Sequence, residues 1–147
     1  MQHIHETYPK IPSPCNCSNI RRASRAVTQF YDEVLKPCGL TITQLGLLRH
    51  LERIEEPTIG ELAKCMRIDR TTLNRNMKPL TDAGLLSVIP GKDSRTRMIL
   101  LTEAGKTAVS MGSALWDEAQ VALQEYLGEN ELKKLGQLLN KLEALVP

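Results

Sequence analysis

The feature that most constrains the fold is a change in the spacing of apolar residues near residue 85. Before that point apolar residues recur every three or four positions, as on one face of an α-helix, and they do so again after residue 102. Between these stretches lie two short β-prone segments, 85–89 and 96–101, joined by turn-forming residues at 90–94. The chain is therefore expected to be mainly α-helical, with one charged β-hairpin.

Four helices are expected before the hairpin, at about 16–36, from 41 onwards, at 58–65 and at 70–83. Capping residues are expected at the starts of the second, third and fourth of these helices. Thr41 with Gln44, and Thr58 with Glu61, have the spacing of capping boxes, in which two side chains and two backbone amides bond reciprocally. Asp69 is expected to be the N-cap of the fourth helix. The third helix is short, and a tight turn connects it to a polar fourth helix. This is the order of a helix-turn-helix motif, and the hairpin that follows makes the motif a winged one.

Two long helices are expected after the hairpin, one from Thr102 to about Leu127 and one beyond Gly128. The expected apolar stripe of the first is Ala104, Ala108, Met111, Leu115, Ala119, Ala122 and Tyr126. The last helix carries a stripe of Leu132, Leu135, Leu139, Leu142 and Val146. Aromatic residues are scarce and leucine is abundant, which also favours helices over a β-sandwich.

The net charge of +2 conceals an uneven distribution. Residues 58–101 carry eight basic and four acidic side chains, a net +4, whereas residues 102–147 carry a net −3 and residues 1–57 a net +1. Positive charge is thus concentrated on the helix-turn-helix and the hairpin, where a nucleic acid would bind.

The fourth helix has an apolar face of Leu73, Met77 and Leu80 and an opposite polar face. Arginine pairs bidentately with guanine and asparagine with adenine, whereas lysine at the far end would contact phosphate. The alternative is an ordinary solvated helix face. The residues expected to contact DNA are Arg70, Thr71, Thr72, Asn74, Arg75, Lys78, Lys92, Asp93, Arg95 and Arg97.

The hairpin tip adds a second indication of DNA binding. Arg95 could enter the narrow, electronegative minor groove, and Asp93 could orient its guanidinium through a charge-assisted hydrogen bond. The alternative is an exposed turn in which Asp93 stabilises the turn and Arg95 is only solvated.

These residues resemble the wing signature of the MarR (multiple antibiotic resistance regulator) family of winged-helix transcription factors. That signature is an aspartate and an arginine separated by one residue, followed after five residues by Leu-Thr. The chain reproduces it with Asp93, Arg95 and Leu101-Thr102. The segments Ile59–Ala63, Arg70–Thr72, Ala83–Leu85 and Thr102–Gly105 also match, and the resemblance spans about 16–145. The chain departs from the family pattern at Arg67, where glycine is frequent, and at Ser87–Pro90, which lacks the frequent arginine.

The resemblance implies an obligate homodimer on a palindromic operator, with Arg95 in the minor groove and Asp93 as its orienting partner. The long apolar stripes fit this, because they exceed what one small lobe needs. Two fourth helices would then lie ~34–36 Å apart, in successive major grooves of double-stranded DNA. The expected organisation is an arm at 1–15, a helical dimerisation region at 16–40 and 102–147, and a winged helix-turn-helix lobe at 41–101.

Cys15 and Cys17 precede the first helix, with Arg21 and Arg22 one turn on, and three interpretations stay open. A helix N-terminus and nearby arginines activate thiolates, so one hypothesis is a redox sensor that forms a disulfide. A second is metal binding together with His3 and His5, although the spacing matches no standard zinc pattern. The third is a pair of partly buried thiols that pack in the dimer interface. No cofactor is expected.

The family resemblance also suggests a small phenolic or aromatic effector, bound between the dimerisation helices and the lobe. Tyr31, Arg49, His50 and Arg53 are the residues expected to line its pocket, with surface solvation as the alternative for each. The expected function is a DNA-binding regulator, a repressor, released by such a molecule or by oxidation.

Two other classes of function have less support in the sequence. A winged helix that binds an acidic protein instead of DNA is the alternative, and the Asp93/Arg95 tip argues against it. An enzyme is not expected, because the sequence has no P-loop, nucleophile-elbow or zinc-protease motif. With no membrane-length apolar run and no signal peptide, we expect a cytoplasmic protein with free thiols.

Overall fold

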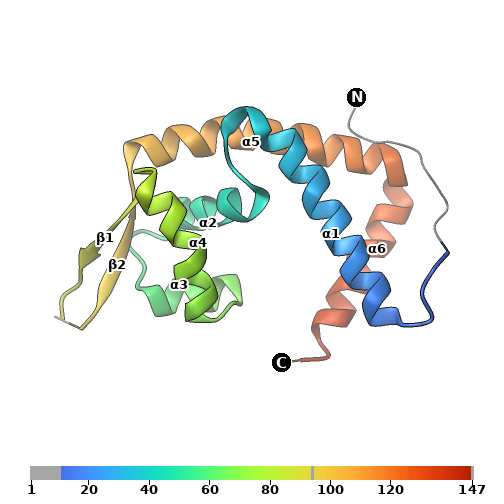
Figure 1. The fold of residues 1–147 in the computed structure, drawn as a ribbon, viewed down its shortest axis with the longest axis horizontal. Coiled ribbons are helices and arrows are strands. Elements are labelled where there is room, and N and C mark those ends of the chain that lie inside the picture. The colour runs from blue at the N-terminus through green and yellow to red at the C-terminus, as the bar shows by residue number, and fades with distance from the viewer. Residues whose placement is uncertain (1–10, 94, 147) are drawn as a thin grey trace.

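The computed structural model describes residues 11–93 and 95–146, and it shows a mainly helical chain with one two-stranded sheet. Its elements in chain order are α1 (Asn16–Leu35), a short 3₁₀ helix (Lys36–Cys38), α2 (Ile42–Arg53), α3 (Ile59–Met66), α4 (Arg70–Asp82), β1 (Leu86–Pro90), β2 (Arg97–Leu101), α5 (Glu103–Leu127) and α6 (Glu129–Glu143). Figure 1 shows α2, α3, α4 and the hairpin gathered into a lobe at one end of α5, with α6 at the other end.

The helix starts follow the local sequence. Both capping boxes form: the Thr41 hydroxyl accepts from the Gln44 amide and the Thr58 hydroxyl from the Glu61 amide, and each partner side chain bonds back. The first helix ends one residue earlier than expected, at Leu35, and a 3₁₀ turn carries the chain to Gly39, whose positive φ ends it.

The lobe has a closed core of aliphatic side chains from every one of its elements. The fully buried residues in it include Leu45, Leu47, Leu48, Leu62, Leu73, Leu80, Leu86 and Ile99. Leu35, Leu40 and Val109 belong to the same core, so the end of α1 and the start of α5 are part of the lobe. The expected boundaries between the dimerisation region and the lobe, at residues 40 and 102, therefore fall within a continuous core.

The hairpin is antiparallel, with Leu86 opposite Leu101 and Pro90 opposite Arg97. Pro90 was expected in the turn, but it is the last residue of β1; both strands of a two-stranded sheet are edge strands, where proline is tolerated. The Ile99 amide donates to the Pro57 carbonyl at 2.9 Å, and Thr58 forms an isolated bridge with Met98. These bonds fix the hairpin against the start of α3.

The hairpin also runs directly into α5. The Thr102 hydroxyl donates to the Gly84 carbonyl at 2.7 Å and accepts from the Gly105 amide at 3.0 Å. A Cβ at Gly105 would overlap the Leu85 carbonyl oxygen, so only glycine allows this approach. The junction holds the hairpin and the end of α4 in a fixed position relative to α5.

Outside the lobe the helices bury little. Tyr31 and Val34 of α1 pack on Ala119 of α5 in a small second cluster, and no residue of α6 is buried. Two residues of the expected α5 stripe, Met111 and Tyr126, are more than half exposed, because α5 turns that part of its apolar surface away from its own chain. No helix within 11–93 and 95–146 combines the length and apolar character needed to cross a membrane.

Candidate DNA-binding surface

The exposed face of α4 begins at a well-formed N-cap. The Asp69 carboxylate accepts from the Thr72 amide at 2.7 Å and from the Thr72 hydroxyl at 3.0 Å. These bonds favour the charged form and lower the pKa of Asp69. Thr72, expected to contact DNA, thus uses its hydroxyl within the cap of its own helix.

Burial of one side of α4 turns the opposite side to solvent. Leu73, Met77 and Leu80 are buried in the lobe, as expected. The residues of the polar face that are exposed are Arg70, Thr71, Asn74, Arg75 and Lys78. Lys78 pairs with Asp82 one turn on, at 3.2 Å, but both side chains stay largely exposed, so the ammonium remains accessible to a phosphate.

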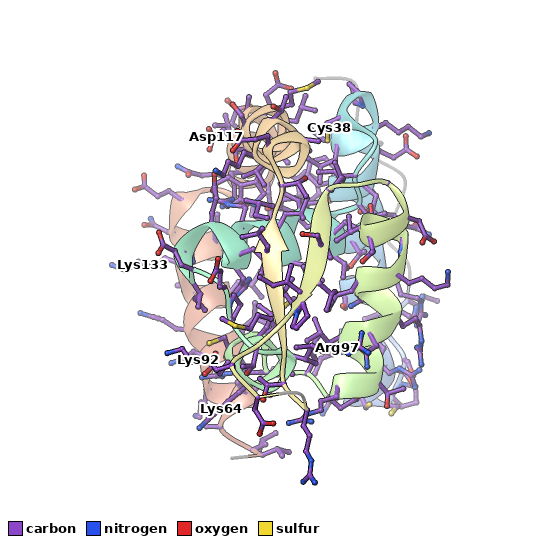
Figure 2. All side chains as sticks on the ribbon, turned by 90° about the vertical axis from the view of Figure 1, so that its left-hand side faces the viewer. Cys38, Lys64, Lys92, Arg97, Asp117 and Lys133 are labelled. Atoms are coloured by element: carbon purple, nitrogen blue, oxygen red, sulfur yellow. The ribbon has the colours of Figure 1, made fainter. Side chains whose placement is uncertain are left out.

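A cleft of about 450 Å³ joins α4 to the hairpin and to the start of α3. Its lining residues are Thr58, Ile59, Gly60, Arg70, Asn74, Arg95, Thr96 and Arg97. Figure 2, which faces the hairpin, shows Arg97 lying between the hairpin and α4. Four of the residues expected from the sequence are thus brought to one cleft: Arg70, Asn74, Arg95 and Arg97. Four more, Thr71, Thr72, Arg75 and Lys78, lie on α4 outside its lining.

Two hydrogen bonds join Asp93 to the residues that follow the hairpin turn. The Asp93 carboxylate accepts from the Arg95 amide at 3.3 Å, and the Thr96 amide donates to the Asp93 carbonyl at 2.9 Å. The expected contact of Asp93 was with the Arg95 guanidinium; the contact present is the turn-forming one, since a carboxylate readily reaches the amide two residues on. Lys92, Asp93 and Arg95 are exposed, and Ser94 lies outside the described residues.

Sequence patterns did not identify Gly60 or Ile59 as part of this surface. Their place in the cleft depends on how α3 packs on α4, which residue spacing does not record. Arg67 was identified as a departure from the family pattern, and it adopts the left-handed conformation, with φ 56°. Its guanidinium lies 3.6 Å from the Glu143 carboxylate of α6, a link between the turn of the lobe and the C-terminal helix.

The two N-terminal thiols are accessible. Cys15 is the N-cap residue of α1, and hydrogen bonds from Ser18 lower its pKa; Cys17 is also exposed. All four cysteines are unpaired. His3 and His5, the other ligands of the metal hypothesis, lie outside the described residues.

Three of the four residues expected to line an effector pocket make contacts of their own. Burial raises the pKa of Tyr31, whose hydroxyl bonds the Gln120 side chain. The Arg49 guanidinium lies 4.4 Å from the centroid of the Trp116 ring. His50 Nδ1 is 2.7 Å from the Gly46 carbonyl oxygen, and Arg53 is exposed at the end of α2.

The sequence and the fold are similar to those of known proteins. Residues 39–95 match the model of the MarR family. The transcriptional regulator MosR of M. tuberculosis, solved in complex with DNA, is 33% identical over 90% of this chain and 99% of its own, with a TM-score of 0.76.

Two more distant structures share the fold. MarR of E. coli with operator DNA is 23% identical over 86% of this chain and 91% of its own, with a TM-score of 0.78. BpsR of Bordetella bronchiseptica is 20% identical over 93% of this chain and 99% of its own, with a TM-score of 0.80. The wing, the α4 surface and these similarities agree: the chain belongs to the MarR family of winged-helix transcriptional regulators.

Proposed function

We propose that this protein is a homodimeric, sequence-specific DNA-binding repressor that acts on a palindromic operator. The observation that carries the proposal is the single surface formed by α4 and the hairpin, where Arg70, Arg95 and Arg97 line one cleft. α4 would enter the major groove, and Arg95 at the exposed hairpin tip would reach the adjacent minor groove. MosR, the relative at 33% identity, was solved with DNA.

Dimerisation is supported by the apolar surface that α1, α5 and α6 leave exposed. On α6 this surface consists of Leu135, Leu138, Leu139 and Leu142. An apolar stripe of this length on a helix without buried residues is typical of an interface between subunits. We therefore assign residues 16–40 and 102–147 to dimerisation and residues 41–101 to DNA binding, although the end of α1 and the start of α5 also pack in the core of the lobe. Residues 1–15 are an arm, described only from residue 11.

Two signals could release such a repressor. One is a small aromatic or phenolic molecule near Tyr31, Arg49, His50 and Arg53; the BpsR structure concerns regulation by 6-hydroxynicotinic acid. The other is oxidation of Cys15 or Cys17. A peroxide would transfer one oxygen atom to the thiolate, giving a sulfenic acid and leaving as water or an alcohol. The exposure of both thiols and the lowered pKa of Cys15 support this chemistry, which fits a reducing cytoplasm as the site of action.

The oxidation hypothesis is tested by treating the wild type, Cys15→Ser and Cys17→Ser with peroxide before measuring DNA affinity. We expect the wild type to lose affinity and at least one variant to resist. If the affinity of the oxidised wild type is unchanged, oxidation is not the signal.

The DNA-binding proposal is tested with a duplex selected from a random library by the wild-type protein. Arg95→Ala should weaken binding severely and reduce the slope of log affinity against log salt by about one for each subunit. Lys133→Ala, which removes an exposed cation of α6 outside the lobe, is the matched control and should leave both quantities unchanged. If no duplex is selected, the protein-binding alternative stands; if Arg95→Ala binds like the wild type, the role given to the hairpin is wrong.

A further inference from the structure

The side chain of Arg70 is folded back onto α3. Arg70 is the first residue of α4, from which a base-contacting side chain would extend into the groove. Its guanidinium lies instead beside Gly60: a Cβ at Gly60 would be 2.8 Å from Arg70 Nη2 and 3.6 Å from Cζ. A contact of 2.8 Å between carbon and nitrogen is inside their van der Waals separation, so any other residue at 60 would displace the guanidinium.

Gly60 has no conformational reason to be glycine. It lies within α3, and the glycines with positive φ are elsewhere, at 39, 84 and 128. Glycine is unfavourable inside a helix, where it loses more backbone freedom than alanine. Within the described structure, the Arg70 guanidinium is what a Cβ at residue 60 would meet.

The cleft beside Gly60 has the charge of an anion site. Its lining residues include Arg70, Arg95 and Arg97, and no Asp or Glu is among them in the described part of the chain. The planar guanidinium offers paired N–H donors that match the oxygens of a phosphate. Arg70 belongs to α4 and Arg97 to the start of β2, so one phosphate bound by these two would tie the two DNA-contacting elements together.

We propose that Arg70 binds a phosphate of the DNA backbone in this cleft, not a base edge, and that Gly60 is the positioning residue that leaves room for its guanidinium there. The inference rests on the proposed DNA-binding function and changes one assignment within it. Arg70 sets the register of α4 on the duplex, while base recognition belongs to other residues of the helix.

The test is a double-mutant cycle on the full-length protein. The variants are Arg70→Ala, Gly60→Ala and the double variant, and the probe is the duplex selected by the wild type together with its single-base-pair substitutions. Gly46→Ala is the matched control, since Gly46 is also helical and no atom lies within 4 Å of its added Cβ. Dissociation constants are measured at several salt concentrations.

We expect Arg70→Ala to weaken binding to every duplex by the same factor, about tenfold, and to lower the salt slope by about one for each subunit. Gly60→Ala should weaken binding in the wild-type background but have no effect once Arg70 is alanine. Gly46→Ala should bind like the wild type.

Three results would overturn the inference: a loss of discrimination at one base pair in Arg70→Ala, an unchanged salt slope, or losses from Gly60→Ala and Arg70→Ala that multiply. The exposed Arg70→Ala change decides the question even if Gly60→Ala fails to fold. A wild type that selects no duplex would instead contradict the proposed function and, with it, this inference.

Discussion

The lobe and the C-terminal helix use leucine in opposite ways. Leu48 in the lobe is fully buried, at 0% exposure, whereas Leu138 of α6 is 58% exposed. The lobe is complete within one chain, because every element contributes to its closed core. α6 has the same residue type at helical spacing, but within the described structure none of its residues is buried. The same apolar pattern therefore forms a core in one region and half of an interface in the other.

The largest effect should come from placing a charge in the α6 stripe. We expect Leu138→Asp to separate the subunits and to weaken operator binding by about a hundredfold or more, because each lobe then binds alone. Sedimentation and DNA titration measure the two effects. Gln137→Asp, which adds the same charge at the neighbouring exposed residue off the stripe, should leave both unchanged. A dimeric Leu138→Asp protein would contradict the difference between the two regions.

Shortening a buried side chain in the lobe should lower the stability of each subunit. Leu48→Ala leaves a cavity in a closed core and should cost about 2–5 kcal/mol of unfolding free energy. The corresponding change in α6, Leu139→Ala, should lower stability mainly by weakening the association of the two subunits. Denaturant titrations at several protein concentrations distinguish the two: the loss in Leu139→Ala should depend on concentration, and a concentration-independent loss there would indicate that α6 is covered by its own chain.

The N-cap of α4 gives a smaller, pH-dependent effect. The hydrogen bonds from Thr72 lower the pKa of Asp69 in the folded protein, so their stabilisation is present above the unfolded Asp pKa of about 3.9 and is lost as pH falls through the folded value. Asp69→Ala should therefore be less stable than the wild type at neutral pH, and the difference should shrink in acid. Asp69→Asn, which keeps an acceptor but cannot ionise, should lack that pH dependence. A difference that persists unchanged in acid would show that ionisation of Asp69 is irrelevant.

The smallest effect concerns the link between the two regions. Arg67 has a left-handed backbone that glycine adopts without strain, and its ion pair with Glu143 is solvent-exposed. Arg67→Gly should change the unfolding free energy by no more than about 1 kcal/mol, in the stabilising direction. Glu143→Gln removes the ion pair alone and serves as the control. If Arg67→Gly has a lower melting temperature than Glu143→Gln, relief of backbone strain does not outweigh the lost side chain.

Features set by nearby residues were the most predictable from sequence. The capping boxes at Thr41 and Thr58 and the cap at Asp69 form because a side chain and an amide three residues on meet whenever a helix begins. The hairpin and the exposed polar face of α4 followed from the apolar spacing. The assignment to the MarR family, carried by the spacing from Asp93 to Thr102, is confirmed by the comparisons.

Features set by distant packing were not predictable. The contact of Arg70 with Gly60 depends on how α4 crosses α3, and no spacing in the sequence encodes it. The exposure of Tyr126 was also missed, because an apolar stripe does not reveal whether its cover comes from the same chain. The residues predicted to contact DNA or an effector remain predictions, since their roles depend on a partner.

The most direct test of the two-region account is the mass of the protein, alone and on its selected duplex. A dimer, about twice the chain mass of 16.4 kDa, should be present at micromolar concentration without DNA, and one dimer should bind each palindromic duplex. Sedimentation equilibrium gives both numbers. A 16.4 kDa monomer throughout that range, binding one chain per duplex, would contradict the account, because the exposed leucines of α6 would then not be half of an interface.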